Sequence, residues 1–206
     1  MNTPILSPGR PPIGSTTPFI SWGWLSLSEF IPATRSLRNI TGLKVTFKKM
    51  SHLDNMPKPK DGTSIICLIN GHYICVSQIK GRTIFFDPLG GPSHAFFHNA
   101  PEIDHIDMQM KVQSNTSVYC GNFCLLFAYI LFIDIHKKFK NDVGLYRIHI
   151  FQAVQSYLNI YPEDLLPNEF IIEMFTIDWK LGEEFYSTVY PKFNAYNNRL
   201  SKDSVS

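Results

Sequence analysis

The chain has little of what would place it in several large protein classes. Its net charge is only +2 over 206 residues and its basic clusters are short, so composition alone does not favour nucleic-acid binding. Its main apolar run, residues 123–133, is eleven residues long, about half of what a membrane-spanning helix needs. Such a run is more typical of a helix in the core of a globular domain.

Cysteine is also scarce. The four residues are Cys67, Cys75, Cys120 and Cys124, and their spacing does not match the paired ligands of structural zinc sites. The sequence begins MNTP, without the charged start and apolar core of a signal peptide. We therefore expect a reducing compartment, free thiols and no metal.

The apolar content is sufficient for one domain with a sizeable core, because 44% of the residues are apolar and 17% are charged. Residues 1–18 are rich in Pro, Ser, Thr and Gly, and residues 192–206 are polar. We expect a flexible Pro-rich arm over 1–18, a single domain over 19–191 and a polar tail over 192–206.

Alternating apolar residues predict a β-meander in the middle of the chain, followed by helices. The expected strands cover residues 64–69, 72–79, 83–86 and 106–112, and the expected helices cover 22–31, 120–138, 145–160 and about 162–180. The tight turn between the first two strands falls at Asn70-Gly71, which tolerate positive φ. The fold class is thus α+β: a mostly antiparallel central sheet packed against a buried central helix, with further helices on the flanks.

Cys120 is the thiol with the best local context for a nucleophile. Gly121 follows it and the central helix is expected to begin there, so the helix dipole and unpaired backbone N–H groups favour a thiolate. Gln113 precedes it by seven residues, across a polar loop that could bring its amide back as an oxyanion donor. The simpler alternatives are a buried structural thiol and a solvated glutamine.

The sequence has seven histidines, of which His72 is the best base for that thiol. It begins one expected strand and Asp87 follows the next, so both lie at the same edge of an antiparallel meander. Neighbouring strands are about 4.8 Å apart, which allows a hydrogen bond between the two side chains. Asp87 before Pro88 also fits an ordinary turn.

The segment from Val112 to Cys124, VQSNTSVYCGNFC, resembles the nucleophile segment of the adenain family, the maturation proteases of adenoviruses. Gly71-His72-Tyr73 resembles the histidine motif of that family, and residues 86–90, FDPLG, resemble its acidic segment. The resemblance covers about residues 65–135. Tyr73 stands where the family usually has Trp, and Asp87 replaces Glu, which is closer to the related Ulp-type proteases.

The resemblance implies a cysteine endopeptidase with a Cys120–His72–Asp87 triad and Gln113 as oxyanion donor. It implies viral capsid or core precursor proteins as substrates, a location in the virion and the host nucleus or cytoplasm, and a monomer. It also implies an activating peptide and viral DNA as partners, although no cofactor is required for the chemistry. A Ulp-like isopeptidase for ubiquitin-like modifiers and an inactive, protease-derived binding protein stay open as alternatives.

Overall fold

The computed structural model describes residues 34–35, 38–39, 41–52, 54–99, 104–137, 147–161, 165, 167–172 and 175. The arm expected over 1–18, the tail over 192–206 and the short helix over 22–31 lie outside the described residues. The domain boundaries therefore stay predictions.

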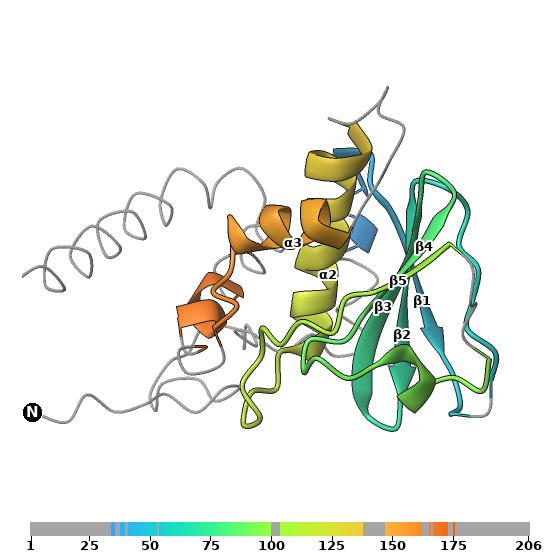
Figure 1. Cartoon of the computed structure of the whole chain (residues 1–206), viewed down its shortest axis with the longest axis horizontal. Coiled ribbons are helices and arrows are strands. Elements are labelled where there is room, and N and C mark those ends of the chain that lie inside the picture. Colours follow the sequence, from blue (N-terminus) through green and yellow to red (C-terminus); the bar gives the residue numbers. More distant parts are fainter. Residues whose placement is uncertain are drawn as a thin grey trace, which may run out of the picture.

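A five-stranded sheet forms one layer of the fold (Figure 1). Its strands are β1 (Lys44–Lys49), β2 (Thr63–Ile69), β3 (His72–Ile79), β4 (Arg82–Phe86) and β5 (His105–Asp107), and they lie side by side in sequence order. The central meander of β2, β3 and β4 is antiparallel, as its alternating sequence and tight turns predict. Asn70 and Gly71 both take positive φ in the first turn.

The expectation of a mostly antiparallel sheet is wrong, because the sheet is mixed. Both edge strands are parallel to their neighbours: β1 to β2, and β5 to β4. Alternation in a sequence specifies a strand and its buried face, whereas direction depends on the connection. The segments 50–62 and 87–104 are long enough to return the chain to the same end of the sheet. The sequence analysis also missed β1.

The strand expected over 106–112 is reduced to the three residues of β5. Gln109 has a φ of 41°, a left-handed conformation that interrupts an extended strand. Beyond it the chain makes only an isolated bridge between Lys111 and Leu89. The alternating residues Met108, Met110 and Val112 are nevertheless buried. The sequence pattern therefore predicted which side chains are buried, but it did not predict that this segment lacks strand pairing.

The central helix runs continuously from Cys120 to Lys137. It is α-helical in α2 (Cys120–Ile130) and continues as the wider π-helical turns of η2 (Leu131–Lys137). Figure 1 shows this helix across one face of the sheet. The Phe127 ring of α2 stacks on Phe86 of β4, with ring centroids 4.0 Å apart. The expected α+β class is confirmed.

Two shorter helical segments follow the central helix. The helix α3 (Arg147–Gln155) is shorter than the 145–160 expected, because the chain turns after Gln155. Residues 167–172 are helical, within the 162–180 expected, and the rest of that range is described only in part. Buried residues form two apolar clusters, a large one that includes α2 and α3, and a smaller one around Phe85 and Phe97.

Among the described residues, one helix is long and apolar enough to meet a test for membrane spans. It is Cys120–Lys137, and 72% of it is buried inside the protein. Length and composition alone are weak evidence, since a core helix of a globular domain passes the same test. Its contacts with the sheet account for its apolar character without a bilayer.

Candidate active site

The structure brings His72 and Asp87 together at one edge of the sheet. His72 is the first residue of β3, and Asp87 directly follows β4. The imidazole Nε2 lies 2.6 Å from Asp87 Oδ1, and the two side chains are 22% and 2% exposed. A short hydrogen bond to a buried carboxylate fixes the ring's orientation and leaves Nδ1 as the nitrogen available to a second group.

Backbone groups of the following turn hold the carboxylate in place. Leu89 N donates to Asp87 Oδ1 at 3.0 Å, and Gly91 N donates to Oδ2 at 2.8 Å. A Cβ atom at Gly91 would lie 2.6 Å from Oδ2, closer than real contacts allow. The turn therefore needs a glycine at this position to let the backbone approach the acid.

The imidazole also interacts with Cys120. Burial alone lowers the pKa of His72, but the hydrogen bond to Asp87, together with the influence of the nearby Asp87 and Cys120 groups, outweighs it and raises the pKa from 6.5 to about 9. The Phe96 ring lies against the imidazole, with centroids 6.0 Å apart and planes 30° apart. His72 is thus hydrogen-bonded to the Asp87 carboxylate, and the nearby Cys120 thiol contributes to the raised pKa of its ring.

Cys120 is the first residue of α2, and its side chain is largely covered, at 7% exposure. The residue before it, Tyr119, makes no side-chain cap to the helix. The backbone N–H groups of a first helical turn have no partner within the helix. A sulfur at this position therefore faces both donors and the positive end of the helix dipole.

The other three cysteines are free thiols in apolar surroundings. Cys124, one turn further along α2, donates from Sγ to Tyr73 O at 3.4 Å. Burial raises the pKa of Cys124 well above its usual value, and burial raises the pKa of Cys67 and Cys75 to about 12. These thiols are in settings that oppose the thiolate form.

Gln113 is buried, at 2% exposure, in the loop that leads to Cys120. Its amide Nε2 donates to Ser117 O at 2.8 Å, and its Oε1 has no hydrogen-bond partner within the described structure. The structure therefore places Gln113 inside the protein rather than in solvent. Its amide is hydrogen-bonded to the backbone of Ser117, which lies three residues before Cys120.

Three residues of this site were missed by sequence analysis. Gly91 lets the backbone approach the Asp87 carboxylate closely, and Phe96 packs against the His72 ring. The Pro88 carbonyl accepts hydrogen bonds from Val112 N at 2.9 Å and Gln113 N at 3.0 Å. The paired glycines after Asp87-Pro88 were a usable signal for a close approach. The role of Phe96 carried no such signal, since it depends on a loop conformation.

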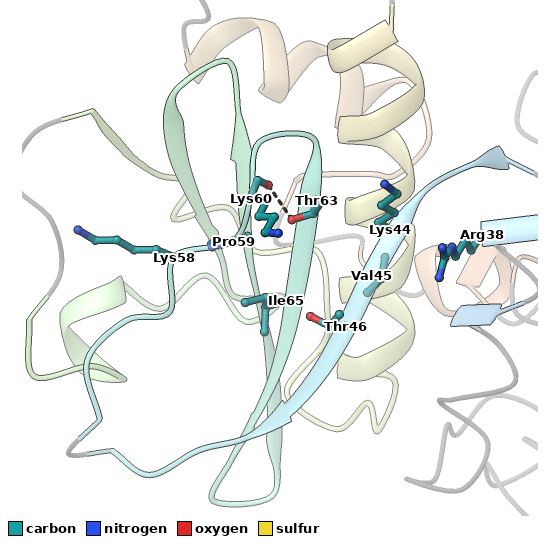
Figure 2. Close-up of a pocket in the computed structure, with 9 residues that line it drawn as sticks. All are labelled: Arg38, Lys44, Val45, Thr46, Lys58, Pro59, Lys60, Thr63 and Ile65. Atoms are coloured by element: carbon teal, nitrogen blue, oxygen red, sulfur yellow. Dashed lines mark hydrogen bonds between the residues drawn. The ribbon is translucent and has the colours of Figure 1, made fainter.

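A hollow of about 430 Å³ lies at the other end of the sheet from His72 (Figure 2). Within the part of the chain that the structure describes, its lining includes four basic residues, Arg38, Lys44, Lys58 and Lys60, and no acidic residue. They come from three segments: the chain before β1, β1 itself and the stretch before β2. Among the described residues, no three His, Cys, Asp or Glu side chains are arranged to hold a metal.

Comparison with known proteins finds no match to this chain, either among protein-family models or among curated proteins.

Proposed function

We propose that the chain is a cysteine endopeptidase with Cys120 as nucleophile, His72 as general base and acid, and Asp87 as the residue that orients the imidazole. One observation carries the proposal: the His72 ring is hydrogen-bonded to a buried carboxylate, and Cys120, a thiol at a helix start, lies near enough to contribute to the raised pKa of that ring. That arrangement is the one that nucleophilic thiol chemistry requires.

The proposed reaction is acyl transfer in two stages. The Cys120 thiolate attacks the peptide carbonyl carbon, and a C–S bond forms while the carbonyl oxygen gains negative charge. The His72 imidazolium donates its proton to the leaving amine as the C–N bond breaks. Water then attacks the thioester with His72 taking its proton, and the C–S bond breaks to regenerate the thiolate.

The negative oxygen needs hydrogen-bond donors at each stage. We assign the N–H groups of the first turn of α2, which have no partner within the helix itself, and the amide of Gln113 as these donors. Its burial in the loop before Cys120 supports this role.

The substrates we propose are viral capsid or core precursor proteins with Gly-rich cleavage sites, on the strength of the resemblance around Cys120. The alternative with specific support is a Ulp-like isopeptidase, because Asp87 is the acid typical of that group. Both use the same four residues and differ only in substrate.

The basic hollow supports a proposal for the activating partners. Four cations and no acid among the described residues that line this hollow favour a polyanion such as viral DNA by charge complementarity. The hollow lies away from His72, so a ligand there would act on activity from a distance. An activating peptide has no assigned position on the described surface.

The function is tested with two substrates offered to the same protein: a fluorogenic peptide with an internal Gly-Gly site and a ubiquitin-family protein with a C-terminal fluorophore. We expect the peptide to be cleaved by the wild-type chain and not by Cys120→Ala. Faster cleavage of the ubiquitin-family probe would move the assignment to the isopeptidase. Cleavage of neither would contradict both enzymatic functions.

A further inference from the structure

The loop that carries Gln113 is held on both sides by two consecutive residues of the helical segment 167–172. Asn168 Nδ2 donates to Val112 O at 2.8 Å, and Ser114 Oγ donates to Glu169 Oε1 at 2.8 Å. Val112 and Ser114 are the immediate neighbours of Gln113 in sequence. A segment more than 50 residues away therefore fixes the backbone before and after the proposed oxyanion donor.

The side-chain amide of Asn168 uses all of its hydrogen-bonding groups. Its side chain is completely buried, its Oδ1 accepts from Asn159 N at 2.7 Å, and its Nδ2 donates to Asn159 O at 2.6 Å as well as to Val112 O. Both amide hydrogens and the amide oxygen are thus in use. A buried amide with this many partners has one orientation, and it holds Val112 rigidly.

The opposite side of the loop is tied to the acid of the site. Pro88 O, in the residue directly after Asp87, accepts from the backbone N–H of Val112 and of Gln113. The Gln113 backbone is therefore fixed relative to Asp87 by Pro88 and relative to the C-terminal segment by Asn168 and Glu169.

The Gln113 side chain depends on this backbone for its direction. Its amide makes one hydrogen bond, to Ser117 O, and its oxygen has no partner within the described residues although it is buried. A buried polar atom without a partner lowers stability. The hydrogen bonds of the amide alone therefore do not account for its orientation, and we attribute that orientation to the conformation of the loop.

We propose that Asn168 and Glu169 are positioning residues that set the direction of the Gln113 amide toward the oxyanion, an inference that rests on the proposed peptidase function. Neither residue touches the substrate. Each acts through a neighbour of Gln113: Asn168 through the carbonyl of Val112, and Glu169 through the hydroxyl of Ser114.

The main test replaces Asn168 with Ala and measures steady-state hydrolysis of the Gly-Gly peptide. A misplacement of about 1 Å in catalytic geometry costs on the order of 100-fold in rate. We expect kcat to fall about 10-fold to 100-fold, with KM changed less than about threefold, because the oxyanion forms only in the transition state.

Alkylation of Cys120 by iodoacetamide separates positioning from general damage. The thiolate displaces iodide from a saturated carbon, so this reaction needs the sulfur and His72 but no oxyanion donor. We expect Asn168→Ala to be alkylated at the wild-type rate. In a Gln113→Ala background, Asn168→Ala should cost less than about twofold in further kcat, because the group through which it acts is gone.

Glu169 provides a second test should Asn168→Ala fail to fold, since its side chain is only partly buried. Glu169→Ala should lower kcat about threefold to tenfold, and Glu169→Gln, which keeps an accepting oxygen for Ser114, should restore it. Ser114→Ala combined with Glu169→Ala should be no slower than either single variant.

Unchanged kcat in both the Asn168 and the Glu169 variants would overturn the inference. It would also be overturned if the loss of kcat in the Gln113→Ala, Asn168→Ala double variant equalled the product of the two single losses. Alkylation that slows in parallel with hydrolysis would also overturn it, since the damage would then reach Cys120. If the wild-type chain is alkylated at Cys120 but cleaves neither the peptide nor the ubiquitin-family probe, the proposed function fails and the inference with it.

Discussion

Two thiols lie one turn apart on the same helix in very different surroundings. Cys120 stands at the first position of α2, near enough to His72 to contribute to the raised pKa of its imidazole. Cys124 is fully buried and donates to the Tyr73 carbonyl, and burial raises its pKa well above the usual value. The comparison teaches that helix position and an imidazole partner, rather than residue type, separate a nucleophile from a core residue.

The sharpest separation comes from replacing each thiol with Ala. Cys120→Ala should lower peptide hydrolysis by about 10⁴-fold or more, since the nucleophile is lost. Cys124→Ala should retain activity within about threefold and lower the free energy of unfolding by about 1–2 kcal/mol, because a small buried group is removed. Hydrolysis rates and urea unfolding measure the two effects; a loss of activity that follows Cys124 would reverse the assignment.

The next largest effect is expected at Asp87, the acid that we propose orients His72. Asp87→Asn removes the negative charge and leaves at most a weaker, neutral hydrogen bond to His72, so the pKa of about 9 should fall and hydrolysis should fall about 10²-fold to 10⁴-fold. In the wild type the imidazolium that we propose protonates the leaving amine is lost as the pH rises through about 9. In the variant this alkaline limb should move to lower pH.

The pH–rate profile of kcat measures this shift. The same raised pKa makes protonation of His72 stabilising for the fold, an effect that is complete below about pH 6.5 and lost as the pH rises through about 9. An alkaline limb at the same pH in both proteins would show that Asp87 does not act through the imidazole.

Gln113→Ala should have a smaller effect on hydrolysis, about 10²-fold, as expected for loss of one oxyanion donor. Alkylation of Cys120 should be unchanged, because it forms no oxyanion. Gln152, an exposed glutamine on α3, provides a control, and Gln152→Ala should match the wild type. Equal hydrolysis by the two glutamine variants would remove Gln113 from the mechanism.

A substitution at Gly91 should affect Cys120 only indirectly, through Asp87 and His72. We therefore expect a smaller loss of kcat. Gly91→Ala places a Cβ 2.6 Å from Asp87 Oδ2, so the acid has to shift, and kcat should fall about tenfold. Gly81→Ala is the matched control: it has a φ of 76° and no atom near its added Cβ. It should lower stability by about 1 kcal/mol and leave kcat unchanged.

The smallest effect on basal activity is expected at the basic hollow. Replacing Lys44 and Lys60 with Ala should leave hydrolysis without added polyanion unchanged. Any stimulation of the wild type by double-stranded DNA at low salt should be reduced in this variant. Equal stimulation of both proteins would exclude the hollow as the site of activation.

Local sequence signals predicted the part of the fold that depends on neighbouring residues. The strands expected over 64–69, 72–79 and 83–86 agree within one residue with β2, β3 and β4, because alternation and turn residues act over short distances. The parallel pairings of β1 and β5 were not predicted, since they depend on how loops return the chain. Gln109 is a second example. Its positive φ interrupts the strand that the alternating sequence predicted to continue to residue 112.

The site divides in the same way. The ends of two predicted strands placed His72 beside Asp87, and the expected helix start placed Cys120 at a terminus. The hydrogen bonds of Asn168 with Val112 could not be predicted, because they join residues that are 56 positions apart and no local pattern reports such a contact. The catalytic roles themselves stay predictions.

The most direct measurement is labelling of the wild-type chain with a thiol-reactive peptide probe, followed by mass-spectrometric mapping of the modified cysteine. The account predicts modification at Cys120, leaving Cys67, Cys75 and Cys124 unmodified, and slow modification in His72→Ala. Modification at Cys124 or in the strands, or a labelling rate that is the same without His72, would contradict the central claim.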